Sequence, residues 1–180
     1  MKIINPVKVS KPVTFRDFPR VWKESWRIKF IMMKPFEGKY PQASSISHCQ
    51  IEEKDPLRFF VLGNSWHVFE GTPMKLKKFF GWPRARTIIN PKIINHERKV
   101  MSMKEGCMSW EQQESKARKM SRWQIVDLEY WTFWGKRRKR LFLYRAALAQ
   151  HEINHMDGLS LDDVYKHDSF KGRQSSYELA

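Results

Sequence analysis

The stretch that decides the fold reads Gln150-His151-Glu152-Ile153-Asn154-His155. Histidines four positions apart lie on the same side of a helix, close enough for both imidazoles to bind one ion. The glutamate between them can reach a water bound to that ion. The alternative interpretation is a solvated polar helix face on which two histidines fall.

Around this motif the sequence predicts a helix over residues 144–157, and Gly158 stands where a left-handed C-cap would end it. A catalytic metal needs at least one ligand beyond two histidines. In zinc proteases this ligand lies downstream, but the residues after Gly158 lack the spacing of the protease motifs. That region offers Asp162, Asp163, His167, Asp168 and Glu178. A generic peptidase of this class is therefore disfavoured.

A second helix is predicted near the N-terminus, over residues 17–34. Trp22, Trp26, Phe30 and Met33 recur there at helical spacing, which predicts an amphipathic helix with these side chains on its apolar face.

The middle of the chain is typical of strands. Short apolar runs at 59–62 and 87–89 are bounded by Gly, Pro or Asn. Residues 123–132 are rich in β-branched and aromatic side chains, 134–136 read as a turn, and 137–142 would return as the second arm of a hairpin. The order helix, β-rich middle, helix predicts an α+β domain.

Length and charge set the outer limits. The chain has 180 residues, enough for one domain with a packed core, and carries 34 basic against 19 acidic residues, a net charge of +15. Such an excess must be either solvated or neutralised by an acidic partner, with ribosomal or other nucleic acid as the first candidate. The basic residues gather in the run 136–140 and in a cluster over 75–86, where the alternative is a solvated face.

The two cysteines, Cys49 and Cys107, form no zinc-finger cluster and fit a reducing compartment. No apolar run approaches the length of a membrane span. We therefore expect a soluble, cytoplasmic monomer with no membrane partner.

A second motif precedes the first by 44 residues, counted from Cys107 to His151, and reads Glu105-Gly106-Cys107-Met108-Ser109. A lone cysteine is more often a small buried hydrophobe than a ligand. Together, however, the two motifs resemble those of peptide deformylase, the metal hydrolase that removes the N-formyl group from nascent polypeptides. Residues 43–50 (ASSISHCQ) stand where that family has its first motif, with both glycines replaced. Asn90-Pro91 resembles the end of a strand in the family.

The resemblance implies a deformylase-like α+β fold, with mixed and antiparallel sheets packed around the central motif helix and an N-terminal helix. It implies a single catalytic domain over residues 1–180. An apparent insertion lies at about 65–83, and a short polar tail follows residue 170.

The resemblance also implies one divalent metal ion per chain, held by Cys107, His151 and His155 with a fourth position open. Fe(II) is the usual ion of the family and Zn(II) also binds, while the donor set suits Ni(II) as well.

Further roles follow from the resemblance. Glu152 would take a proton from water and pass it to the leaving amine. The side-chain amide of Gln50 and the backbone N–H of Met108 would stabilise the oxyanion. Tyr144, Ala147 and Leu148 lie one and two turns before His151, so with Met108 they are candidate walls of a methionine pocket, and the alternative for each is ordinary core. Ser45 is a further candidate substrate-binding residue.

Two functions remain open at this point. The first is a deformylase that acts on N-formylmethionyl nascent peptides and whose basic surface could also bind the ribosome. The second is a catalytically impaired deformylase-like protein that binds ribosome or RNA, which the altered first motif favours. Asn154 replaces an aspartate of the family and could pair with Arg122, so the expected change is weaker orientation of the helix.

Overall fold

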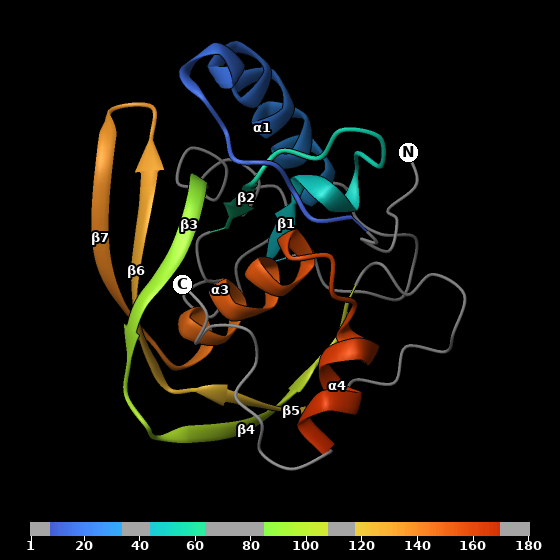
Figure 1. Cartoon of the computed structure of the whole chain (residues 1–180), viewed down its shortest axis with the longest axis vertical. Helices are drawn as coiled ribbons and strands as arrows, with labels where there is room; N and C mark the ends of the chain where they lie inside the picture. Colours follow the sequence, from blue (N-terminus) through green and yellow to red (C-terminus); the bar gives the residue numbers. More distant parts are fainter. Residues whose placement is uncertain (1–7, 34–43, 64–84, 108–117, 170–180) are drawn as a thin grey trace.

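The computed structural model describes residues 8–33, 44–63, 85–107 and 118–169. In Figure 1 the motif helix, α3, lies in the middle of the molecule, and β-strands surround it. The described helices are α1 (Phe18–Met33), α3 (Leu143–Met156) and α4 (Leu161–Ser169), with 3-10 turns η1 (Phe15–Asp17) and η2 (His48–Gln50). The predicted α+β class and the central position of the motif helix are confirmed.

The described strands form two antiparallel sheets, one with five strands in the order β1-β2-β3-β6-β7 and one with β4 and β5. Their bounds are β1 (Ser45–Ser47), β2 (Phe59–Leu62), β3 (Arg86–His96), β4 (Val100–Glu105), β5 (Arg118–Trp123), β6 (Ile125–Thr132) and β7 (Gly135–Phe142). The predicted hairpin is present as β6 and β7, which pair from Ile125–Phe142 to Thr132–Gly135.

The predicted strand over 123–132 is wrong at its start. Trp123 ends β5 and Ile125 begins β6, so the chain changes sheets at Gln124. The N–H of Gln124 bonds the carbonyl of Lys99, while its own carbonyl accepts the N–H of Leu143. Because Gln124 bonds Lys99 and Leu143 rather than β3, it separates β5 from β6. Neither contact can be inferred from the local sequence.

Asn90-Pro91 does not end a strand, because β3 continues to His96. The register against β6 shifts between Ile89 and Lys92. Pro91 has no N–H to donate to the sheet, and Asn90 adopts a positive φ of 47°, so the pair forms a bulge. The Asn90 side chain compensates by bonding both the N–H and the carbonyl of Val13, at 2.7 and 2.8 Å.

Helix α1 buries a different face from the one predicted. Trp22 and Phe30 are each 51% exposed and Trp26 is 36% exposed, while the Met33 side chain lies outside the described part. The buried stripe is rotated by one residue and consists of Val21, Ser25, Ile28 and Met32. Both stripes recur at helical spacing, so periodicity could not choose between them. The stripe that packs is the one with the smaller side chains, which let the helix approach the sheet closely.

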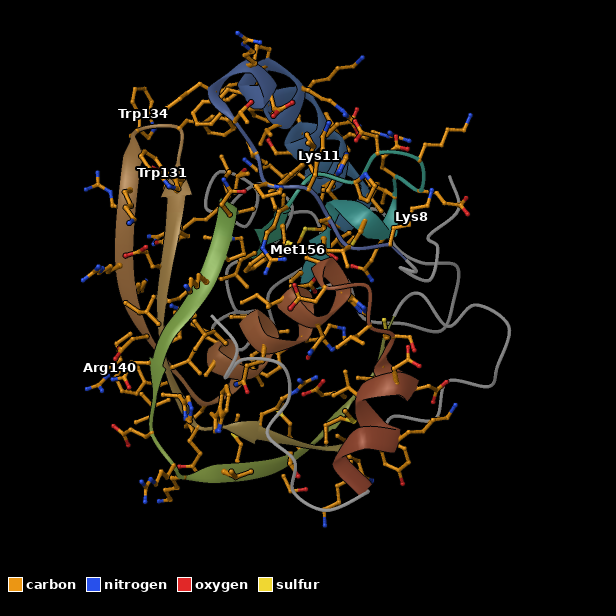
Figure 2. The ribbon with its side chains drawn as sticks, viewed as in Figure 1. Lys8, Lys11, Trp131, Trp134, Arg140 and Met156 are labelled. Carbon is orange, nitrogen blue, oxygen red and sulfur yellow. The ribbon has the colours of Figure 1, made fainter. Side chains whose placement is uncertain are left out.

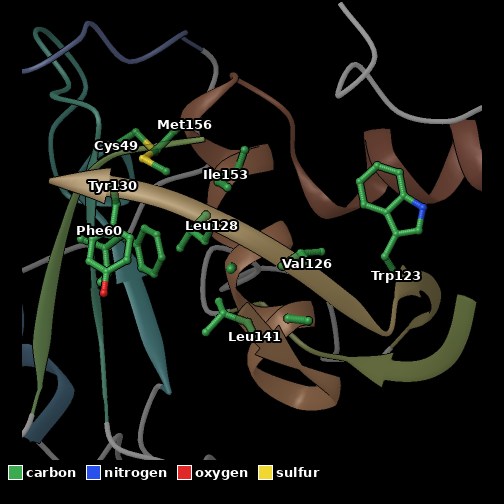
Figure 3. Packing of buried hydrophobic residues seen from close by; sticks show 12 residues of the cluster. Cys49, Phe60, Trp123, Val126, Leu128, Tyr130, Leu141, Ile153 and Met156 are labelled. Atoms are coloured by element: carbon green, nitrogen blue, oxygen red, sulfur yellow. The ribbon is translucent and has the colours of Figure 1, made fainter. Parts of the chain in front are cut away.

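The central strands are buried on both faces. Successive residues point to opposite sides of a strand, so Phe60 and Ile88 join the cluster under α3 while Phe59 and Ile89 join the cluster under α1. Figure 3 shows the first cluster, with Leu128 of β6 beside Ile153 of α3. The result is three layers: α1, the sheet and α3.

Helix α4 was not predicted, because the chain after Gly158 reads as polar. Leu161 and Val164 are nevertheless buried, and they pack on Met120 of β5. None of the described helices is long and apolar enough to cross a bilayer. The predicted insertion at 65–83 and the tail after residue 170 lie outside the described residues, as does Met108.

Candidate metal centre

Three of the predicted site residues meet where β4 ends beside α3. The Sγ of Cys107, two residues beyond β4, lies 3.2 Å from Nε2 of His155. Nε2 of His155 lies 3.0 Å from Nε2 of His151, one helical turn earlier. All three ligand atoms fall within 4.8 Å of one another.

The hydrogen bonds of the two imidazoles fix the direction of their lone pairs. Nδ1 of His151 lies 3.0 Å from Oε2 of Glu105, and Nδ1 of His155 lies 3.0 Å from the carbonyl oxygen of Leu159. Both partners are acceptors, so each Nδ1 carries the hydrogen and each Nε2 offers its lone pair. Two lone pairs and a sulfur therefore face one point, an arrangement that a cation stabilises.

The pKa shifts of these groups show the same preference for a positive charge at this point, whether a proton or a metal ion supplies it. Burial alone would raise the pKa of the Cys107 thiol, but the neighbouring His155 and His151 hold it well below its usual range. Burial would lower the pKa of His151, yet its contacts with Cys107 and Glu105 raise it to about 10. A thiolate and imidazole lone pairs are the forms that bind metals, and a proton competes for the same position.

The donor set therefore fits a divalent ion. One thiolate and two imidazoles suit Zn(II), Fe(II) and Ni(II), and three protein ligands are the number typical of catalytic rather than structural sites. The other cysteine contrasts with Cys107: burial raises the pKa of the Cys49 thiol to about 12, so it behaves as a core side chain.

A buried ionic network supports His151 from behind. Arg122 of β5 donates from Nε and Nη2 to both oxygens of Glu105, at 2.7 and 2.8 Å, and from Nη1 to Oδ1 of Asn154 at 2.7 Å. The predicted contact between Asn154 and Arg122 is thus present. Burial would raise the pKa of Glu105, but the bonds from Arg122 and His151 lower it to about 2. Asn154 is neutral, so of these two partners Glu105 is the one that balances the guanidinium charge.

Gln50 faces the site with its donor. Its Oε1 accepts the N–H of Ser47 at 2.9 Å and the hydroxyl of Ser47 at 3.1 Å. The Nε2 group is therefore turned away from Ser47, and it lies 3.8 Å from Sγ of Cys107. The geometry presents a fixed N–H donor beside the candidate metal ligands.

Glu152 is almost completely buried, with 2% of its surface exposed. The hydroxyl of Ser45, on β1, donates to its Oε1 at 2.6 Å. Within the part of the chain that the structure describes, Oε2 has no hydrogen-bond partner. From the sequence, Ser45 was expected to meet the substrate, and its contact with Glu152 was not foreseen.

The candidate pocket residues line the start of α3. The Tyr144 hydroxyl lies 2.7 Å from Oγ of Ser44. Ala147 is buried and Leu148 half-buried, yet neither belongs to the core cluster under the helix that contains Ala146 and Ala149. Met108 lies outside the described residues.

The sequence matches the family model of polypeptide deformylase over residues 23–170. The chain belongs to the polypeptide deformylase family. Members of this family are metal-dependent hydrolases, in agreement with the Cys107, His151 and His155 group. Among curated proteins, none matches the chain.

Solved deformylase structures share this fold. A probable peptide deformylase from the Synechococcus phage S-SSM7 is 17% identical, with a TM-score of 0.67 over 91% of this chain and 99% of that one. The Thermotoga maritima peptide deformylase is 22% identical, with a TM-score of 0.66 over 91% and 95%. The Plasmodium falciparum enzyme is 22% identical, with a TM-score of 0.64 over 96% and 90%. At these identities the likeness establishes the fold.

One functional contact of the motif helix was missed in the sequence. The Gln150 amide accepts the N–H of Trp123 and donates to its carbonyl, both at 3.0 Å, so it fastens α3 to the end of β5. A glutamine placed directly before the first histidine was the available signal. The predicted C-cap at Gly158 is present with φ of 79°, and it leads the chain to Leu159, whose carbonyl accepts from His155.

Proposed function

We propose that this protein removes the N-formyl group from the formyl-methionine at the start of nascent polypeptides and releases formate. The observation that carries the proposal is the convergence of Cys107, His151 and His155 beside the buried carboxylate of Glu152. Family membership supports the same reaction.

In this proposal each residue has a separate task. Cys107, His151 and His155 would hold one Fe(II), Zn(II) or Ni(II) ion. When bound, the ion supplies Lewis acidity and lowers the pKa of water. Glu152 would accept the proton of the attacking water at Oε2, which has no partner among the described residues, and return it to the leaving amine. Nε2 of Gln50 would donate to the developing oxyanion.

Substrate binding is proposed for the surfaces beside α3. The side chains of Tyr144, Ala147 and Leu148 would receive the methionine of the peptide, with Met108 adding an apolar contact and its backbone N–H an oxyanion donor. The backbone of Ser45 would bond the peptide main chain. The support is that Tyr144, Ala147 and Leu148 lie along the helix turns before His151, outside the main core cluster.

The impaired RNA-binding alternative gains little from the basic run of β7. Lys136 and Arg138 both pair with Glu129, and Arg140 pairs with Asp127. These ion pairs neutralise much of the positive charge that would otherwise attract a phosphate. Figure 2 shows Arg140 on the outer side of the sheet.

A ribosome contact, if β7 makes one, is proposed for the opposite face. Alternation along the strand places Arg137 and Lys139 there, and the pKa of Lys139 is lowered by burial and by the nearby charges of Arg86 and Arg145. Replacing Arg137 and Lys139 by Gln should weaken co-sedimentation with ribosomes and flatten its salt dependence. The same replacement of Lys136 and Arg138 is the matched control. Equal effects of the two pairs would contradict this assignment. The cytoplasmic location and the monomeric state stay predictions.

The test of the function is an assay of formate release from a formyl-methionyl peptide after anaerobic purification and metal analysis. We expect one metal ion per chain and formate release. Cys107→Ala should lose both, whereas Cys49→Ala, the change at the other free cysteine, should keep the metal. Metal-loaded protein that releases no formate would refute the proposed function.

A further inference from the structure

Strand β1 presents two serines to the motif helix. It pairs with β2 from Ser45–Leu62 to Ser47–Phe60. Ile46, between the serines, belongs to the cluster on the α1 side of the sheet. Because side chains alternate along a strand, Ser45 and Ser47 face the opposite side, where α3 lies. Ser47 there holds the Gln50 amide, and Ser45 contacts Glu152.

The contact between Ser45 and Glu152 leaves the two carboxylate oxygens in different states. Oε1 accepts the Ser45 hydroxyl at 2.6 Å, a short distance typical of a hydrogen bond to an ionised acceptor. Oε2 is buried and has no partner among the described residues. A buried polar atom without a partner requires an explanation, and a catalytic proton acceptor is one.

We propose that Ser45 is a positioning residue for Glu152: its hydroxyl holds Oε1, so that Oε2 alone is presented to the proton that the reaction transfers. This inference rests on the proposed function, and it assigns to the Ser45 side chain a role distinct from backbone contact with the substrate. The resemblance supplies no such role, because the family has glycine at this position and glycine has no hydroxyl.

The physical advantage is preorganisation. A glutamate side chain has three rotatable bonds, and a donor from a paired strand restricts them before the substrate arrives. The donor also settles which oxygen stays available, because a serine hydroxyl has one hydrogen to give. Losing the hydroxyl should therefore slow the chemical step without changing how the peptide is held.

The kinetic test uses metal-loaded protein and a formyl-methionyl peptide. Ser45→Ala should lower kcat by about 10- to 100-fold and leave KM within about twofold. Ser45→Thr keeps a hydroxyl on a strand residue and should restore kcat to within about threefold. Ser25→Ala is the matched control, because Ser25 is also buried but bonds the carbonyl of Trp22 within α1. It should match the wild type.

A second readout does not depend on activity. Thermal unfolding of the zinc-loaded protein should show that Ser45→Ala lowers Tm by about 4 °C when Glu152 is present. In the Glu152→Ala background the same change should shift Tm by less than about 1 °C, because the hydroxyl has lost its acceptor. Glu152 is not a proposed ligand, so the metal content should be equal in all four proteins.

Several outcomes would overturn the inference. A wild-type kcat in Ser45→Ala would do so, as would a raised KM at constant kcat, which would make Ser45 a substrate-binding side chain. Equal Tm shifts in both backgrounds would show that the Ser45 hydroxyl does not interact with Glu152. A wild type that releases no formate would refute the proposed function and, with it, the kinetic effect expected of Ser45, whereas coupled Tm shifts would still support the orienting contact.

Discussion

Helices α3 and α1 pack against opposite faces of the same sheet, and they reverse the usual distribution of side chains. Helix α3 buries Gln150, His151, Glu152, Asn154 and His155. Helix α1 leaves its largest aromatic side chains partly exposed. The difference shows that hydrophobicity alone does not decide which side chains are buried here. Side chains are buried where they find hydrogen-bond partners or where their small size lets a helix pack closely on the sheet.

The partners of the polar side chains explain why α3 can bury them. Gln150 bonds the backbone of β5, Asn154 accepts from Arg122, and His151 and His155 each bond an acceptor through Nδ1. A buried polar group with a partner costs little, whereas one without a partner costs about 1–3 kcal/mol. On the α1 side of the sheet the buried His48 accepts the N–H of Leu57 at Nδ1. Unpaired buried atoms occur on both sides within the described residues: Nε2 of His48, and Nδ2 of Asn154 and Oε2 of Glu152 on α3.

The largest expected effect is on the chemistry of α3. Glu152→Gln should keep the metal and the fold but lose about 100- to 10,000-fold in formate release, because an amide cannot accept the proton. Steady-state kinetics and metal analysis measure both quantities. Glu129→Gln on β6, which changes a carboxylate that pairs with Lys136 and Arg138, is the control and should match the wild type. Near-normal turnover of Glu152→Gln would place the base elsewhere.

The network behind α3 should have the next largest effect. Arg122→Met leaves the Glu105 carboxylate buried without its guanidinium partner, which should lower the free energy of unfolding by about 3–5 kcal/mol. Arg140→Met breaks an exposed ion pair with Asp127 and should cost about 0–1 kcal/mol. Chemical denaturation measures both. Similar losses in the two variants would show that the buried network contributes no more to the free energy of unfolding than an exposed ion pair.

The assignment of the buried face of α1 can be tested with two substitutions. Ile28→Ala should lower the free energy of unfolding by about 2–5 kcal/mol, because Ile28 is completely buried. Trp22→Ala removes a larger side chain that is half exposed, although it contacts the rings of Trp26 and Phe133. We expect a loss of about 1 kcal/mol. The reverse order of the two losses would restore the aromatic stripe as the packed face.

The smallest effect concerns the histidine beside α1. Burial, and then the charge of Arg20, lower the pKa of His48 to about 4 from 6.5, although Glu24 and Glu52 oppose this shift. The unfolded chain therefore binds a proton first as pH falls. Protonation of His48 therefore favours the unfolded state. The free energy of unfolding is unaffected above pH 6.5 and falls between pH 6.5 and 4, by about 3 kcal/mol at most.

The measurement is the free energy of unfolding as a function of pH, in the wild type and in His48→Asn. The asparagine can still accept the N–H of Leu57, which Nδ1 of His48 accepts at 2.9 Å, but it does not titrate. The variant should show a flatter profile between pH 4 and 6.5. Parallel profiles would mean that His48 does not titrate differently in the folded and unfolded states.

Predictions of which element forms, made from spacing along the chain, succeeded in several places. The motif helix and its cap at Gly158, and the hairpin of β6 and β7, are all present. Each rests on local chemistry: a helical period, a left-handed glycine, or a turn between two apolar runs. Two predictions that depended on the neighbours of an element failed, at the exposed Trp22 of α1 and at Gln124, where β5 and β6 separate. The contact between Asn154 and Arg122, which came from the resemblance, is present.

The site residues also divide into those that local spacing predicted and those that only tertiary packing brings together. The four-residue interval between His151 and His155 places both imidazoles on one side of a helix wherever that helix forms, so the sequence was sufficient to nominate them. Their approach to Cys107 depends on β4 and α3 meeting in space, and here the nomination came from a resemblance. The contact between Ser45 and Glu152 joins residues 107 positions apart, and the register of β1 beside α3 decides it. No local pattern encodes such a contact, because it exists only when the sheet and the helix have packed together.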